Sequence, residues 1–142
     1  MSLIAIIRFK GFVGTNKKIE ETLGRIRLRR KNVCVVLDET PELKGILEKI
    51  KNFTAYGDIK EETLAKLIKE RGKVMGKSKA NVENAEKAAK DLIAGKKLEE
   101  MGIKPFFRLH PARGGIKSKL HYPKGVLGNH GENINKLIER ML

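Results

Sequence analysis

Hydrophobic residues follow two different spacings along the first part of the chain, and each spacing predicts a different element. Residues 3–9 form a continuous apolar run of the length of a buried strand, and residues 33–37 form a second one. Between them, the apolar residues of segment 19–26 recur every three or four positions, as on one face of a helix that Thr15 or Asn16 can cap. The pattern therefore predicts a strand, a helix and a strand, in that order.

A second helix and a third strand follow. Thr40-Pro41 pairs an N-cap residue with a proline at the first helical position, where the missing N–H removes no hydrogen bond. The apolar stripe of this helix consists of Leu43, Ile46, Leu47 and Ile50. Residues 53–56 predict a third strand that ends at Gly57. Two helices on one face of a three-stranded antiparallel sheet would bury these stripes, so residues 1–59 predict an α+β core of β-α-β-α-β order.

Residues 60–142 predict a C-terminal extension with two or three helices and a basic, glycine-rich segment. One helix ends at Gly72, since glycine commonly follows a helix end. A second helix begins at Asn81. Its apolar residues, which we expect to face inward, are Ala85, Ala88, Ala89, Leu92 and Ile93. Asn129 or Gly131 opens a final helix.

The charge balance indicates the chemistry of the partner. The 142 residues include 31 Lys and Arg against 17 Asp and Glu, a net charge of +14. Such a balance indicates a polyanion, with nucleic acid as the first candidate and an anionic membrane surface as the second. The positive charge is concentrated in three blocks, residues 1–31, 60–80 and 104–142, which are separated by slightly acidic ones.

Two further features of the composition indicate the compartment. No apolar run approaches the roughly 18 residues of a membrane span, and the apolar start of the chain is too short for a signal peptide. Cys34 is the single cysteine, so neither an internal disulfide nor a cysteine-based metal cage can form. We therefore expect a cytoplasmic protein without a membrane partner.

Segment 104–119 combines aromatic, cationic and glycine residues and contains no acidic residue. Phe106 and Phe107 anchor its first half, which is extended enough to be a strand. Its remaining candidate residues are Arg108, His110, Arg113, Gly114, Gly115, Lys117 and Lys119. Arginine and lysine suit phosphate, and glycines admit the close approach of a partner's backbone, so we predict an RNA-binding segment. A solvated basic loop is the alternative.

A second cationic cluster follows the first predicted helix. It consists of Arg25, Arg27, Arg29, Arg30 and Lys31. One or two cations would complement the helix dipole, but five in seven positions exceed that need. We predict that this cluster and the basic loop at 73–79 face RNA, whereas the helix at 41–50, in a net acidic region, does not.

Other motifs have a simpler structural interpretation. Residues 72–78 resemble a phosphate-binding P-loop, but only three residues separate the glycines and a helix precedes them. The GxxG of residues 128–131 resembles that of KH domains, yet no helix precedes it, which favours a glycine turn. The three histidines lack metal-ligand spacing, and Asp38-Glu39 point to opposite faces of a strand end. We therefore expect no metal, cofactor, small-molecule substrate or catalytic site.

Short motifs distributed over nearly the whole chain occur in the same order as in a known protein family. They lie at residues 6–8, 11–14, 23–30, 33, the helix from Pro41, 55–57, 67–72, 113–117, 128–129 and 134–141. The most specific are Arg-Gly-Gly-Ile-Lys at 113–117 and Gly-Asn at 128–129 followed by residues 134–141. Together they resemble the archaeal form of the L30 family of large-subunit ribosomal proteins, whose eukaryotic counterpart is called L7.

The resemblance implies a three-stranded antiparallel sheet with two helices, similar to a ferredoxin-like fold, and a C-terminal addition. It implies no catalysis. Family members are components of the large ribosomal subunit that bind ribosomal RNA near the five-S RNA, beside neighbouring ribosomal proteins. A free-standing nucleic-acid-binding regulator is the alternative, and an enzyme acting on phosphorylated substrates comes third.

The charge blocks and the resemblance together predict which residues contact RNA. These are Arg8, Lys10, Arg25, Arg27, Arg29, Arg30, Lys31, Arg71, Lys73, Lys77, Lys79, Arg108, His110, Arg113, Gly114, Gly115, Lys117, Lys119, His121 and Asn129.

Overall fold

The computed structural model describes residues 3–10, 16–71, 85–94, 106–111 and 125–141. The elements follow in the order β1 Leu3–Arg8, α1 Lys17–Arg25, β2 Val33–Asp38, α2 Pro41–Ile50, β3 Thr54–Asp58, α3 Glu61–Arg71, α4 Ala85–Ile93, β4 Phe107–Arg108, β5 Gly128–Asn129, a 3-10 turn Gly131–Asn133 and α5 Ile134–Met141. The α+β class and the predicted β-α-β-α-β order of the first sixty residues are confirmed.

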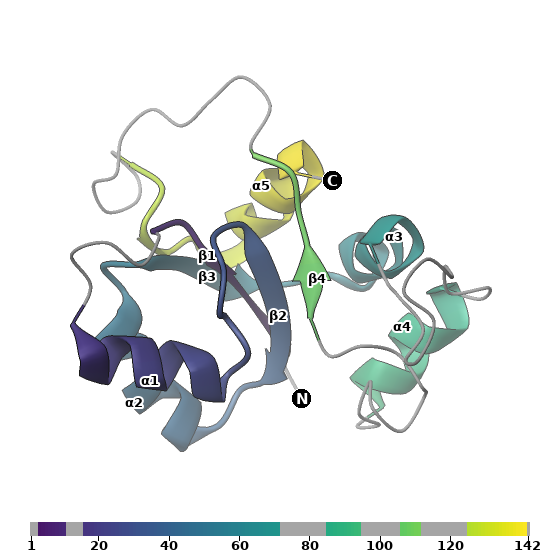
Figure 1. Ribbon diagram of the computed structural model, residues 1–142. Helices are drawn as coiled ribbons and strands as arrows, with labels where there is room; N and C mark the ends of the chain where they lie inside the picture. The colour runs from purple at the N-terminus through teal and green to yellow at the C-terminus, as the bar shows by residue number, and fades with distance from the viewer. Residues whose placement is uncertain (1–2, 11–15, 72–84, 95–105, 112–124, 142) are drawn as a thin grey trace, which may run out of the picture.

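One sheet with the strand order β4-β2-β1-β3-β5 organises these elements (Figure 1). β1 lies at its centre and pairs antiparallel with β2 and β3, so that Ile6 is opposite Val35 on one side and Tyr56 on the other. β4 extends the β2 edge antiparallel, with Val33 opposite Arg108, and β5 extends the β3 edge in parallel. The three central strands are those that the sequence predicts. The two edge strands are additional, because a strand of two residues is too short to show a periodicity.

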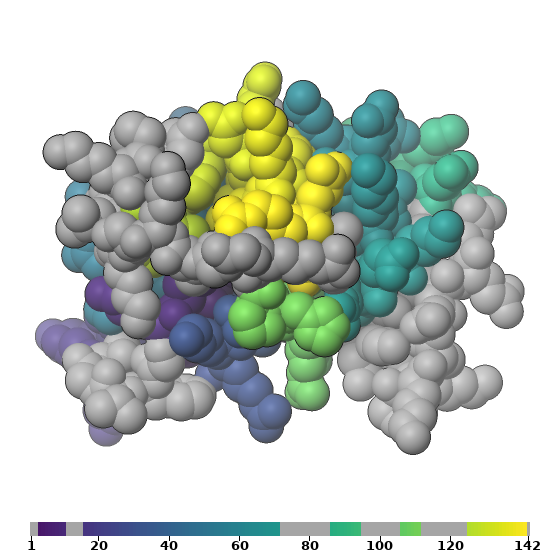
Figure 2. Space-filling model, turned by 90° about the horizontal axis from the view of Figure 1, so that it is seen from above, coloured from purple at the N-terminus to yellow at the C-terminus, as the bar shows by residue number. Residues whose placement is uncertain are grey.

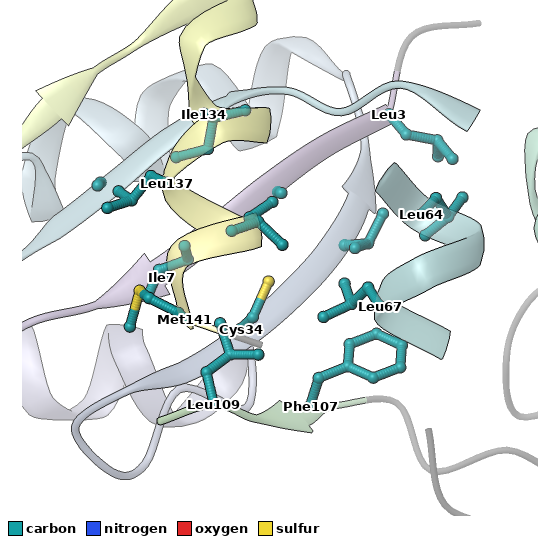
Figure 3. Close-up of a cluster of buried hydrophobic side chains, with 14 of the residues drawn as sticks. Leu3, Ile7, Cys34, Leu64, Leu67, Phe107, Leu109, Ile134, Leu137 and Met141 are labelled. Atoms are coloured by element: carbon teal, nitrogen blue, oxygen red, sulfur yellow. The ribbon is translucent and has the colours of Figure 1, made fainter. Parts of the chain in front are cut away.

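Helices cover both faces of the sheet. Ile4 and Ile6 of β1 pack against buried residues of α1, α2 and β2. Leu3, Ala5 and Ile7 point the other way and pack with residues of α3, α4, α5 and β4 (Figure 3). The continuous apolar run of β1 follows from this two-sided burial. The prediction that the first two helices share one face of the sheet is confirmed.

Side-chain caps begin the first two helices. The Asn16 side chain accepts a hydrogen bond from the backbone N–H of Lys18 at 3.0 Å, so Asn16 is the N-cap of α1. The Thr40 hydroxyl accepts one from the N–H of Leu43 at 3.1 Å, and Pro41 is the first residue of α2. The predicted start of α2 is therefore confirmed.

The C-terminal helix joins the second half of the chain to the sheet. α5 lies beside α3 (Figure 2), and Lys66 of α3 forms an ion pair with Glu139 of α5 at 3.2 Å. Beyond β4, the backbone N–H of His110 donates to the carbonyl oxygen of Met141 at 2.9 Å. The core and the extension, predicted over residues 1–59 and 60–142, thus share one sheet and one hydrophobic cluster.

Two local predictions are wrong. β3 continues through Gly57 to Asp58, because the missing side chain at position 57 admits the carbonyl oxygen of Gly131 and the side chain of Ile134. Ile93, predicted to face inward, is 37% exposed. The buried stripe of α4 consists of Ala88, Ala89 and Leu92, and Ile93 lies just outside it, about 40° around the helix from Ala89.

Candidate nucleic-acid interface

The pairing of β4 with β2 brings together two basic segments that lie far apart in the sequence. Val33, which follows the cationic cluster of residues 25–31, is the register partner of Arg108. One residue further on, the backbone N–H of Leu109 donates to the carbonyl oxygen of Asn32 at 2.9 Å. Segment 106–110 therefore lies alongside the residues that connect α1 to β2.

Four arginines line one hollow of about 360 Å³ at this junction. Its lining residues are Arg27, Arg29, Arg30, Val33, Phe106 and Arg108, and we call it the arginine hollow. The four arginines are all exposed, and none of the described residues that line the hollow is acidic. The guanidinium carbon of Arg108 lies 5.7 Å from the ring centroid of the half-buried Phe106. The hollow is therefore a concave cationic surface with an aromatic wall.

The residues after α1 alternate between core and surface. Ile26 and Leu28 are buried in the cluster beneath α1 and α2, whereas Arg25, Arg27 and Arg29 are exposed. This alternation presents the arginines on one side while their neighbours fix the backbone.

Arg8 holds this turn from inside the molecule. Its side chain is 1% exposed and forms an ion pair with Glu20 of α1 at 2.6 Å. It also donates to the carbonyl oxygens of Leu28 at 2.8 Å and Lys10 at 2.7 Å. A guanidinium enclosed in this way cannot reach RNA, so the prediction of Arg8 as an RNA contact is wrong. Its bond to Leu28 instead fixes the backbone between Arg27 and Arg29.

The remaining predicted contacts within the described ranges do not line the arginine hollow. Arg25 and Lys31 are exposed beside it in the sequence. The ammonium of Lys10, a half-buried residue, lies 5.3 Å from the ring centroid of Phe53. Arg71 is half-buried at the end of α3, and His110 is exposed beyond β4.

Asn129 lies at the far edge of the sheet. It is exposed on β5, four inter-strand spacings of about 4.8 Å each from β4. Its side chain accepts a hydrogen bond from the N–H of Gly131 at 2.9 Å, and both Gly128 and Gly131 have positive φ. Gly128 and Asn129 thus form the short strand β5 and Gly131 opens the 3-10 turn, so only the second half of the GxxG segment is a turn. Asn129 and the arginine hollow are separate surfaces.

Nine predicted contacts lie outside the described residues and remain predictions. They are Lys73, Lys77, Lys79, Arg113, Gly114, Gly115, Lys117, Lys119 and His121. The P-loop-like residues 72–78 lie outside them as well.

The described part of the chain also includes a buried thiol, Cys34, and a buried imidazole, His130. Within it, no three His, Cys, Asp or Glu side chains are grouped to hold a metal, and no helix has the length and apolarity to cross a bilayer. Burial raises the pKa of Cys34 to about 12, so its thiol stays protonated. Burial also lowers the pKa of His130, whose Nε2 lies 2.5 Å from the carbonyl oxygen of Val126.

Comparison with known proteins identifies the family. The family model described as ribosomal protein L30p/L7e matches residues 4–53. Proteins named large ribosomal subunit protein uL30 from Archaeoglobus fulgidus, Nanoarchaeum equitans and Methanocella arvoryzae are 43%, 41% and 40% identical to this chain. The alignments cover 98%, 100% and 98% of this chain and 99%, 100% and 99% of those proteins.

These likenesses extend over essentially the whole chain and place it among the ribosomal proteins. Within that class, the chain belongs to the L30p/L7e family, as the motifs in the sequence indicate. The match over residues 4–53 includes Arg27, Arg29 and Arg30 but ends before Arg108.

Proposed function

We propose that this protein is a structural component of the large ribosomal subunit that binds ribosomal RNA near the five-S RNA, beside neighbouring ribosomal proteins. The observation that carries the proposal is the convergence of Arg27, Arg29 and Arg30 with Arg108 in one hollow. The net charge of +14 and the names of the relatives support it.

The arginine hollow acts by binding phosphate rather than by catalysis. A guanidinium offers a planar set of donors that can hold two phosphate oxygens at once. Four of them on one concave surface neutralise phosphates where RNA segments converge, and so hold the orientation of those segments. Most contacts are then made to the RNA backbone and its shape, and the role requires no cofactor.

Sedimentation of the tagged full-length chain tests the assignment to the ribosome. A structural component travels with the large subunit in a density gradient and stays bound at moderate salt. A free-standing regulator stays near the top of the same gradient, and that result would overturn the proposal.

Salt dependence tests the electrostatic account of RNA binding. If about six cations reach phosphates, each contributes roughly 0.7–0.9 to the slope, so log affinity falls against log salt with a slope of about −4 to −5. A nearly flat dependence would contradict phosphate binding by these cations.

Two matched triple variants test the location of the interface. Replacing Arg27, Arg29 and Arg30 with alanine should weaken RNA binding and leave the melting temperature nearly unchanged, because all three are exposed. The control replaces Lys44, Lys49 and Lys51 of the α2 region with alanine, which removes the same charge. This control removes the ion pairs of Lys44 with Glu39 at 3.5 Å and of Lys51 with Glu48 at 3.4 Å. Both pairs involve largely exposed side chains and contribute little to stability. Equal losses of RNA affinity would show that net charge, and not the arginine hollow, determines binding.

Directed hydroxyl-radical probing tests the proximity to five-S RNA. Cys34 is the only cysteine and is fully buried, so a cysteine introduced at the exposed Lys31 can be labelled selectively with an iron chelate. Bound to the large subunit, the labelled protein should cleave five-S RNA or the large-subunit RNA segments next to it. Cleavage confined to remote segments would refute the proposed location.

A further inference from the structure

The end of α1 has the hydrogen bonds of a Schellman motif but not its usual residue. The backbone N–H of Leu28 donates to the carbonyl oxygen of Leu23 at 2.8 Å, and that of Arg27 donates to Gly24 at 3.1 Å. These two bonds define the motif, in which the residue after the C-cap takes a left-handed conformation and is usually glycine. Here that residue is Arg27, with φ +68°.

An arginine at this position is costly, because its Cβ crowds the backbone in the left-handed conformation and glycine avoids this contact. The motif itself needs no side chain there, since its apolar contact is made by Leu23 and Leu28, which are both fully buried. Strained conformations of this kind are concentrated at functional sites. Arg27 also lines the arginine hollow, so the strain and the candidate site coincide in one residue.

The arginine hollow has the size of a small ligand site and a cationic lining that suits an anionic ligand. Its volume of about 360 Å³ lies within the range of roughly 300–1,000 Å³ that is typical of such sites. Phe106 provides a half-buried ring with the Arg108 guanidinium 5.7 Å from its centroid, and three further arginines lie around it. Unpaired RNA bases stack on aromatic rings and guanidinium planes, whereas paired bases are not available for such contacts.

Resting on the RNA-binding function proposed above, we propose that the arginine hollow binds one unpaired nucleotide of a folded RNA. The base lies against Phe106 and Arg108. The phosphate is bound by Arg27, Arg29 and Arg30, and Arg27 occupies its left-handed position because the guanidinium is needed there. A continuous duplex fits only the rim of the hollow.

Two hairpin RNAs, identical except for one bulged nucleotide, test the nucleotide pocket with the full-length protein. Since stacking of one base contributes a factor of roughly ten or more, the parent should bind the bulged hairpin about tenfold more tightly than the paired one. The variant Phe106→Leu, which keeps an apolar side chain, should lose this preference while its affinity for the paired hairpin is unchanged.

Arg27→Gly separates ligand binding from stability. Glycine relieves the left-handed strain, so the melting temperature should rise, while loss of a charged contact to phosphate should weaken binding of both hairpins about tenfold. The matched control is Asn32→Gly, the other non-glycine position with positive φ among the described residues, at +65°. Asn32 does not line the hollow, so its replacement should leave RNA affinity unchanged.

Three results would overturn the inference. One is equal affinity of the parent for both hairpins, and the second is retention of the bulge preference in Phe106→Leu. The third is an Arg27→Gly variant that binds RNA like the parent or melts at a lower temperature. None of these results affects sedimentation with the large subunit, so failure of the pocket is distinguishable from failure of the proposed function.

Discussion

Replacing Gly57 with alanine tests how β3 packs against the turn that opens α5. A Cβ at position 57 would overlap the carbonyl oxygen of Gly131 and lie 2.9 Å from Cβ and 3.0 Å from Cγ2 of Ile134. The oxygen belongs to the backbone and Ile134 is fully buried, so neither can yield by a simple rotation of an exposed side chain. Either β3 or the 3-10 turn must therefore move.

Such a movement is resisted by hydrogen bonds on both sides of Gly57. The N–H of His130 donates to the carbonyl oxygen of Tyr56 at 2.8 Å, and Nδ2 of Asn135 donates to that of Asp58 at 3.1 Å. Overpacking costs about 1–3 kcal/mol, and the reduced freedom of the unfolded chain offsets about 0.4–1 kcal/mol of that. We expect a net loss of about 1–2 kcal/mol, which lowers the melting temperature of a chain of this size by roughly 3–7 °C.

Thermal and urea unfolding of Gly57→Ala and Gly45→Ala provide the measurement and its control. Gly45 is exposed within α2, and an added Cβ would meet no atom within 4 Å. Alanine is the better helix former, so Gly45→Ala should stabilise the protein by about 0.8–1 kcal/mol. A Gly57→Ala variant as stable as the parent would refute the close approach of β3 to Gly131.

Three buried groups give predictions for the same unfolding assays. Arg8→Met leaves the carbonyl oxygen of Leu28 and the carboxylate of Glu20 without this partner. The variant should therefore lower the free energy of unfolding in urea by about 2–4 kcal/mol. An unchanged unfolding midpoint would contradict the buried ion pair. Cys34 should react with a thiol reagent only as the protein unfolds, because its pKa is raised to about 12 and it is fully buried; rapid labelling of the native state would contradict this. The pKa of His130 is lowered from 6.5 in the folded state, so the unfolded state binds more protons below that value. The stability contribution of neutral His130 should therefore be fully present above about pH 6.5 and be lost as the pH falls through the folded pKa. The variant His130→Gln should lose less stability on acidification. An equally steep fall in the variant would exclude His130 as the cause.

The elements with a long periodic pattern could be predicted, and those without one could not. β1 begins with a run of five apolar residues, and the Thr40-Pro41 pair begins α2 where its capping chemistry indicates. β4 and β5 have two residues each and form because larger elements place their backbones at the sheet edges. The continuation of β3 through Gly57 depends on Gly131, which lies over seventy positions further along the chain.

The same distinction applies to the candidate site. The excess of cations after α1 is visible in the sequence, and all five of them are exposed. That Arg108 joins Arg27, Arg29 and Arg30 depends on the β2–β4 register, which no local pattern reveals. The charge of Arg8 predicts the surface, whereas its position between the buried Ile7 and Phe9 favours the interior, where its side chain lies.

RNA affinity and protein stability should respond differently to substitution of a buried arginine and of exposed arginines. Between positions 25 and 29 the apolar side chains of Ile26 and Leu28 are buried, while the arginines between them are exposed. The exposed arginines can therefore be replaced by alanine with little effect on folding. Arg8 fixes the Leu28 carbonyl from below, so its loss should both destabilise the protein and loosen the backbone that presents Arg27. RNA affinity measured well below the melting temperature separates substitution of the buried Arg8 from substitution of the exposed arginines. Under those conditions Arg8→Met weakens RNA binding only by displacing the backbone that presents Arg27. We therefore expect a smaller loss of RNA affinity from Arg8→Met than from replacing the exposed arginines.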